Sequence, residues 1–202
     1  VVDTLELRYP QFDGLNLTYE TREGVLKHCS RAHAEALEAA EPGGVGQRFL
    51  LRQQPSLEAQ LCNLADEIAY NAHDIDDGVR SGLITLEQLR EVPLFDRYRV
   101  QALTEHPELD TPQGQRRLLY DAIRRMLSAQ VYDVIEATGA ALALARPVSV
   151  DEVRSLPPLV GFGAEMRAQS QSLKRFLFHN LYRHAQVTQT TDQARQVVRD
   201  LF

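Results

Sequence analysis

Acidic and aromatic side chains recur at a regular spacing in one stretch of the chain, residues 55–82. Within it, Asp66, Tyr70 and Asp74 follow one another at intervals of four residues. On an α-helix this spacing stacks three functional groups along one face, because residues four apart are neighbours on the helix surface. Stacked carboxylates repel one another unless something positive lies nearby. We therefore expect either a divalent metal or basic side chains from a facing helix beside them.

The same stretch has the apolar pattern of an amphipathic helix. Six apolar residues recur on the side opposite the acids: Leu57, Leu61, Leu64, Ile68, Ile75 and Val79. We predict that this side packs into the core, and that the helix opens at Pro55-Ser56 and ends near Gly82. The alternative is that the acidic face is only solvated. A solvated face usually mixes charges of both signs, so the lack of Lys and Arg in this stripe favours a functional face.

Two other polar clusters have weaker signals. His28 and His33 lie near Cys29, but a spacing of five residues is poor geometry for two ligands on one helix, and no second ligand pair follows at zinc spacing. We interpret this cluster as packing or surface groups. A basic stripe consists of Arg116, Arg117, Arg124 and Arg125. We interpret it as a solvated or subunit-facing edge rather than a contact for phosphate, an allosteric nucleotide or single-stranded DNA.

Helix signals run along the whole chain. Caps or an early proline mark six predicted starts: Thr18, Pro55-Ser56, Thr85 with Gln88, Pro93, Thr111-Pro112 and Ser149 with Glu152. A last long helix is predicted over residues 164–187, with a terminal helix after Thr191. The apolar cluster from Leu156 to Phe162 is interrupted by proline and glycine, which suits a loop better than a strand. We therefore predict an all-α fold.

The composition is that of an ordinary globular protein. Hydrophobic residues make up 44% of the 202 residues and charged residues 25%. Two cysteines are too few for a disulfide framework, and no apolar run approaches a membrane span, so we predict a cytoplasmic protein with no membrane partner. The net charge of −6 argues against a general nucleic-acid coat. Because the chain starts at Val1 and stops at Phe202 inside an apolar pattern, we expect a fragment of a longer protein.

Three segments resemble motifs of the HD-domain deoxynucleoside triphosphate (dNTP) triphosphohydrolases, the dGTPase-like family. They are ADEIAYNAHDIDD (65–77), similar to the family's last motif; GLNLTYETREGVLKH (14–28), typical of its bacterial branch; and LKRFLFHNLYRHAQV (173–187), similar to its C-terminal substrate helix. The resemblance covers most of residues 1–90 and returns over 165–187. It implies an HD-domain orthogonal helical array, with residues 1–202 as the C-terminal portion of a single HD-type hydrolase domain.

The resemblance also implies an activity and a site. Members of the family convert a dNTP and water into a deoxynucleoside and intact triphosphate. Asp66 matches their final metal-binding aspartate, and Tyr70 and Asp74 match positions that contact the deoxyribose. Lys174 matches a basic residue that holds phosphate, and Tyr182 matches a tyrosine near the sugar and base. The implied cofactor is a divalent metal such as Mg²⁺ or Mn²⁺, and the implied partners are a dNTP substrate and further copies in a homo-oligomer.

One departure from the family pattern concerns the metal. The family's first histidine and its His-Asp pair lie upstream of GLNLTYE, and by register the dipeptide His73-Asp74 is not that pair. One carboxylate, Asp66, does not hold a catalytic metal by itself. We therefore predict that these 202 residues are inactive alone and assign no catalytic residue. Two alternatives stay open: another HD nucleotide phosphohydrolase, or a noncatalytic nucleotide-binding or assembly module on the same scaffold.

Overall fold

The chain folds into two compact units in the computed structural model, which describes residues 1–201. Unit 1 comprises residues 1–64 and 139–160, and unit 2 comprises residues 65–138 and the chain from 161 onward. Two long helices, α4 (Leu57–Arg80) and α7 (Gln115–Ala145), contribute residues to both units. The assignment of the whole chain to a single domain stays a prediction.

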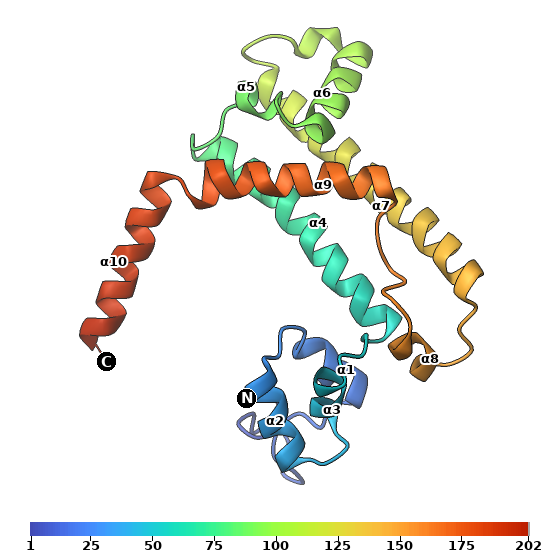
Figure 1. The fold of residues 1–202 in the computed structure, drawn as a ribbon. Helices are drawn as coiled ribbons and strands as arrows, with labels where there is room; N and C mark the ends of the chain where they lie inside the picture. The colour runs from blue at the N-terminus through green and yellow to red at the C-terminus, as the bar shows by residue number, and fades with distance from the viewer. Residues whose placement is uncertain (202) are drawn as a thin grey trace. The chain divides into compact units, whose positions relative to one another are not determined.

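Every regular element within residues 1–201 is helical, apart from an isolated antiparallel bridge between Tyr9 and Phe12 (Figure 1). Unit 1 contains α1 (Tyr19–Val25), α2 (Arg31–Ala40), α3 (Val45–Leu50), the start of α4 (Leu57–Arg80), the end of α7 (Gln115–Ala145) and α8 (Val150–Ser155). Unit 2 contains the rest of α4 and α7, with α5 (Leu86–Leu89), α6 (Pro93–Glu105), η1 (Pro107–Leu109), α9 (Ala164–Leu177), η2 (Phe178–Tyr182) and α10 (Ala185–Leu201). The all-α prediction is confirmed.

Local capping explains where most helices begin. The Thr18 hydroxyl accepts a hydrogen bond from the Thr21 amide at the start of α1. At α5 both bonds of the predicted capping box form between Thr85 and Gln88, and Pro93 is in the first turn of α6. The side chains of Thr18 and Thr85 satisfy amide groups that have no partner inside the helix, and Pro93 has no N–H group that would need one. For these reasons such residues mark helix starts in the sequence.

The predicted start of α7 at Pro112 is wrong by three residues. The Thr111 hydroxyl accepts a hydrogen bond from the Gly114 amide and closes a turn, and the helix begins at Gln115. At Gly114 the chain passes so close to Leu109 that a Cβ atom would lie 2.4 Å from the Leu109 carbonyl oxygen. The close approach to η1 therefore fixes this start as much as the cap does.

The single helix predicted over residues 164–187 is also wrong. The α-helix α9 ends at Leu177 and passes into a π-helical turn, η2. The Arg183 amide donates to the Phe178 carbonyl, the wider five-residue step of that turn. A new helix, α10, begins at Ala185, six residues before Thr191, after which the terminal helix was predicted.

A buried ion cluster organises unit 1. The Glu23 carboxylate, fully buried on α1, lies 2.8 Å from Nε of Arg48 on α3 and 3.6 Å from Nε of Arg154 on α8. It also accepts a hydrogen bond of 3.2 Å from the amide of Ser56, the residue before α4. Burial lowers the pKa of Arg48, and the Glu23 carboxylate opposes that effect. One carboxylate therefore connects three helices with the start of a fourth.

The two helices α2 and α3 approach closely at Gly46. A Cβ atom at this position would lie 2.7 Å from the carbonyl oxygen of Ala34 and 2.8 Å from the amide nitrogen of Glu38. Both neighbours are backbone atoms, which cannot swing aside as a flexible side chain can. Glycine is therefore required at this contact.

The core of unit 2 is built where α9 lies against other helices of the same unit (Figure 1). Its largest fully buried apolar side chains include Phe95, Met126, Leu173 and Leu177. A polar contact is enclosed among them, because Nε2 of the fully buried Gln130 on α7 donates to the Ser170 hydroxyl on α9 at 3.0 Å. At the start of α9, the Gly163 amide donates to the Asp133 carboxylate at 2.8 Å. These contacts fix the position of α9 along α7.

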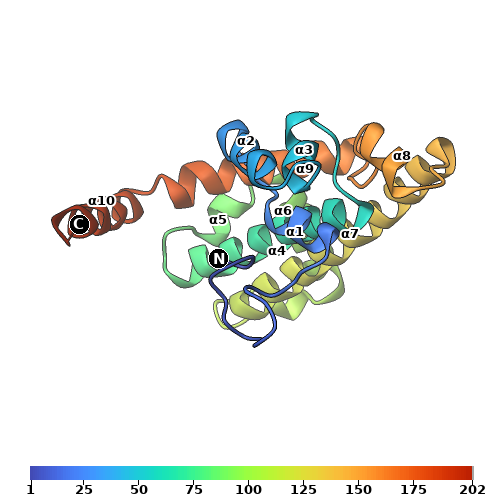
Figure 2. The ribbon, with the colours of Figure 1, turned by 90° about the horizontal axis from the view of Figure 1, so that it is seen from below.

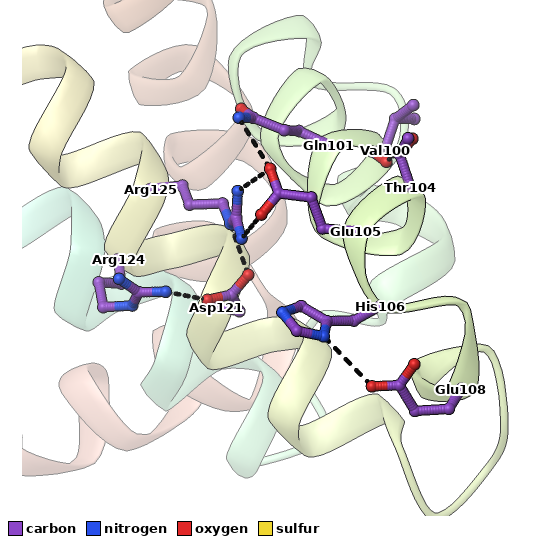
Figure 3. A network of polar contacts seen from close by, with 9 residues as sticks. All are labelled: Val100, Gln101, Thr104, Glu105, His106, Glu108, Asp121, Arg124 and Arg125. Carbon is purple, nitrogen blue, oxygen red and sulfur yellow. Dashed lines mark hydrogen bonds and ion pairs between the residues drawn. The ribbon is translucent and has the colours of Figure 1, made fainter.

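An ion-pair network connects α6 with α7 in unit 2 (Figure 3). The guanidinium of Arg125 donates to both carboxylate oxygens of Glu105, at 2.8 and 2.7 Å. It also donates to Asp121 on its own helix at 2.5 Å, and Asp121 accepts a further bond from Arg124. Bidentate pairing fixes an arginine in one orientation, so this network holds the two helices in register.

The last described helix, α10, projects from the rest of its unit, as Figure 2 shows. None of the residues Ala185–Leu201 is buried, and Val197, Val198 and Leu201 are among the exposed large apolar side chains. No helix within residues 1–201 is both long and apolar enough to cross a lipid bilayer.

Candidate functional site

Two of the three segments singled out from the sequence come together in unit 2. Glu67 on α4 pairs with Lys174 on α9, with Oε2 and Nζ 2.9 Å apart. About two turns further along each segment, the hydroxyl of Tyr182 in η2 donates to Oδ2 of Asp74 on α4 at 2.5 Å. Since both contacts advance in the same direction, this part of α4 and the α9–η2 segment run in the same sense where they cross (Figure 1).

The helix α4 separates a core face from the face that carries the candidate residues. Ile68, Ala72 and Ile75 are buried on one side. The other side holds the α4 site face, which we define as Asp66, Tyr70 and Asp74. Asp66 is exposed, Tyr70 is 61% exposed and Asp74 is half-buried. The four-residue spacing thus lines up the three groups as the sequence predicted.

The predicted core face of α4 is only partly correct. Ile68 and Ile75 are buried, whereas Leu61 is 50% exposed. The sequence did not anticipate that Asn71 is buried on the same helix. Helical periodicity identifies a stripe but does not say how much of it meets another element.

The π-helical turn places Tyr182. After α9 ends at Leu177, the wider turn changes the direction in which the following side chains leave the segment. The side-chain amide of Asn180 donates to the Phe176 carbonyl at 2.9 Å and satisfies a backbone group there. Turns of this kind inside helical segments are often found at functional sites.

The contact with Asp74 changes the pKa of the Tyr182 phenol. Its hydrogen bond to Asp74 raises the pKa of the phenol to about 12, with further contributions from burial and from the charges of Asp74 and Tyr70. The physical cause is that the phenol donates its proton to a carboxylate, and a phenolate beside that carboxylate would be repelled. Tyr182 is therefore a hydrogen-bond donor at neutral pH.

Positive charge lies beside the acidic residues of α4 at two places. The Lys174 ammonium comes from the facing helix and pairs with Glu67, which lies outside the α4 site face. Arg80 comes from α4 itself and pairs with Asp77. The pair of Asp77 and Arg80 was not predicted, although residues three apart are neighbours on a helix surface.

The donor set does not by itself make a metal site. Among residues 1–201, no group of three or more His, Cys, Asp or Glu side chains is arranged to hold a metal ion. Asp66 provides one carboxylate, which is fewer ligands than transition-metal sites use. His73, seven residues further along α4, is exposed. The described residues therefore do not fit a bound metal without further ligands.

Glu67 is the site residue that the sequence analysis missed. It follows Asp66 directly, but it was not part of the acid–tyrosine–acid stripe. Glu67 could have been found by comparing residue spacings in the two segments. Glu67 and Asp74 are seven residues apart on one helix, and Lys174 and Tyr182 are eight apart on the other segment. Each of these intervals is about two helical turns.

The histidine–cysteine cluster and the basic stripe belong to other segments of the chain than the candidate site residues. His28, Cys29 and His33 line a surface cavity of about 600 Å³ in unit 1 together with apolar side chains. In the basic stripe, Arg116 lies 5.6 Å from the ring centre of Tyr120. Arg125 belongs to the ion-pair network with Glu105. The Arg125 side chain is only 15% exposed, so the interpretation of the stripe as a solvated or subunit-facing edge is wrong for this residue. The partners of the stripe stay predictions.

Two comparisons with known proteins find matches to this chain. Residues 160–202 match the phosphohydrolase-associated domain family, so both Lys174 and Tyr182 fall inside the matched segment. The whole chain is 56% identical to a deoxyguanosinetriphosphate triphosphohydrolase-like protein of Ralstonia nicotianae, covering 100% of this chain and 50% of that protein.

Proteins with the same description match in other bacteria. The identity is 52% in Bordetella pertussis and 49% in Thiobacillus denitrificans, over 202 residues in each case. The match covers 100% of this chain and 50% and 51% of those proteins. The chain thus spans about half the length of the curated relatives it matches. On these similarities, the chain belongs to the deoxyguanosine triphosphate triphosphohydrolase-like family.

Proposed function

We propose that this chain is part of a metal-dependent enzyme that hydrolyses a dNTP to a deoxynucleoside and triphosphate. The observation that carries the proposal is the double contact of α4 with the α9–η2 segment, Glu67 with Lys174 and Asp74 with Tyr182. It gathers an ammonium group, a phenol and carboxylates in one unit, from positions more than one hundred residues apart in sequence.

Each of these groups suits one part of a deoxynucleotide. The Lys174 ammonium is a compact cation that can bind a phosphate oxygen and stabilise an anionic leaving group. The Asp74 carboxylate can accept a hydrogen bond from a sugar hydroxyl, and the flat rings of Tyr70 and Tyr182 can enclose the deoxyribose. Asp74 is engaged with Tyr182, so a sugar hydroxyl would share or replace that bond.

Metal dependence is a separate part of the proposal. Asp66 would supply one ligand, and the portion of the relatives' length that this chain does not span would supply the others. It follows that the 202 residues alone are expected not to turn over dNTPs. A cytoplasmic location and assembly into a homo-oligomer belong to the same proposal.

The test compares two proteins, this chain and a chain extended to the full length of the relatives. Each is incubated with each dNTP and Mn²⁺, and triphosphate release is measured. Activity confined to the extended chain is the expected result. Turnover by the 202 residues alone would contradict the incomplete metal site. If neither protein releases triphosphate but nucleotides raise the melting temperature, the noncatalytic module is the correct interpretation.

A further inference from the structure

Glu67 has a contact that none of the assigned roles explains. Its carboxylate lies 2.9 Å from the ammonium of Lys174, the group proposed to hold the phosphates. The two side chains are 36% and 59% exposed, so the pair is in contact with water. An acid at this position is unexpected in a site for a polyanion, because it repels the ligand and occupies the cation.

The surroundings of Lys174 leave room for an anion. Gln171, Lys174, Arg175 and Phe178 line a surface cavity of about 330 Å³. Arg175 adds a second cation there, and within residues 1–201 no ion pair is found for it. Lys174 has three N–H donors. The bond to Glu67 engages one of them and draws the ammonium toward α4.

We propose that Glu67 is a positioning residue, the internal counter-ion of Lys174, which a triphosphate group displaces when it binds. The proposal rests on the proposed function and adds to it the element that regulates phosphate affinity. Before binding, the carboxylate holds the ammonium over the α4 site face. On binding, the phosphate oxygens take the ammonium and the Glu67 side chain turns to solvent. Displacement is feasible because a solvent-exposed ion pair is weak.

Glu67 therefore weakens the affinity of this site for every phosphate ligand. Replacing Glu67 by Gln removes both the competition for Lys174 and the repulsion of the ligand. Inorganic tripolyphosphate is then expected to bind about twofold to fivefold more tightly, the range that corresponds to an exposed ion pair. The same change should lower KM for the dNTP and leave kcat largely unchanged, since it acts on binding.

The experiment uses the full-length protein and inorganic tripolyphosphate as the probe. Affinity is measured by calorimetry and as inhibition of dNTP hydrolysis, at low and high ionic strength. The gain of Glu67→Gln should shrink as salt rises, because salt screens exposed charges. Glu136→Gln is the matched control, since it makes the same charge change at an exposed residue of α7 that has no ion pair among the described residues. It is expected to leave tripolyphosphate affinity unchanged.

A double-mutant cycle shows whether Glu67 acts through Lys174. In a Lys174→Gln background, Glu67→Gln is expected to have no effect on tripolyphosphate affinity. Glu67→Asp withdraws the carboxylate by one methylene and should give an intermediate affinity. An unchanged or weaker affinity in Glu67→Gln, or an equal gain without Lys174, would overturn the proposal.

The two proposals fail in different ways. If the wild-type protein releases no triphosphate from any dNTP, the proposed enzymatic function is wrong. Calorimetry with tripolyphosphate then still decides the role of Glu67, since it needs no turnover. If turnover occurs but the cycle shows no coupling between Glu67 and Lys174, only the inference about Glu67 is wrong.

Discussion

The hydroxyl of Tyr182 donates a hydrogen bond to Oδ2 of Asp74 at 2.5 Å, between residues 108 positions apart. This bond is the main reason that the pKa of Tyr182 is raised from 10.0 to about 12. Because the folded pKa exceeds the unfolded one, the stabilisation is complete below pH 10.0 and is lost as the pH rises through about 12. The contact can therefore be detected without any ligand, through the raised pKa of Tyr182.

We expect Asp74→Asn to lower the pKa of Tyr182 toward 10.0, since the carboxylate that opposes the phenolate is removed. The measurement is a tyrosinate absorbance titration. Tyr182→Phe identifies the transition, because the phenol that titrates last should disappear from the curve. A high-pH transition that persists unchanged in Asp74→Asn would show that the bond does not form in solution.

Asp74 also offers a test of sugar recognition. In the active full-length protein, Asp74→Ala should reduce the preference for dNTPs over ribonucleotides, because a carboxylate that accepts from a sugar hydroxyl is lost. A loss of about tenfold to a hundredfold in kcat/KM for the dNTP is expected if one charge-assisted hydrogen bond is removed. The measurement is kcat/KM for matched pairs such as dGTP and GTP. An unchanged preference would contradict the role of Asp74.

Glu23 is expected to control the stability of unit 1. Glu23→Ala leaves the guanidinium groups of Arg48 and Arg154 without their buried carboxylate and should cost about 3–5 kcal/mol. Urea unfolding followed by circular dichroism measures the loss. The control is Glu20→Ala on the same helix, an exposed residue at which a change within about 0.5 kcal/mol is expected. Equal losses in the two variants would show that the buried cluster contributes nothing special.

The buried contact between Gln130 and Ser170 predicts a non-additive pair of mutations. Ser170→Ala leaves the Gln130 amide without its acceptor in a dry core and should cost about 1–3 kcal/mol. Combining it with Gln130→Leu removes the stranded donor, so the double variant should recover part of that loss. The double-mutant cycle is measured by thermal or urea unfolding of the wild type, the two single variants and the double variant. Simple additivity would mean that the two side chains do not interact.

The network of Arg125, Glu105 and Asp121 predicts sensitivity to acid (Figure 3). Hydrogen bonds from Arg125 lower the pKa of Glu105 from 4.5. Burial raises the pKa of Asp121, but bonds from Arg125 and Arg124 outweigh it and lower that pKa from 3.8. Depressed carboxyl pKa values give stability that is present above the unfolded values and lost as the pH falls through the folded ones.

Arg125→Gln should therefore reduce the fall in melting temperature between about pH 7 and about pH 3. The matched control is Arg117→Gln, an exposed arginine on the same helix with no ion pair among the described residues. That variant should keep the wild-type acid sensitivity. The idea fails if Arg125→Gln shows the same pH dependence as the wild type.

Capping chemistry made most helix starts predictable. Thr18, Thr85 with Gln88, and Pro93 act within one turn of sequence, so their effect does not depend on distant residues. The start of α7 was misplaced because Gly114 packs against Leu109, and the break after Leu177 was missed because a π-turn has no strong local signal. These errors occur where the chain meets another segment or departs from the regular helix.

The sequence by itself determined the all-α class and the stacking of Asp66, Tyr70 and Asp74 on one helix face, because both depend on spacing within a few residues. Only the tertiary structure decided which groups of the two segments meet. Glu67 pairs with Lys174, and Tyr182 reaches Asp74 through a turn that interrupts the helix. Contacts between residues more than one hundred positions apart depend on how whole helices pack, and a local pattern carries no information about that.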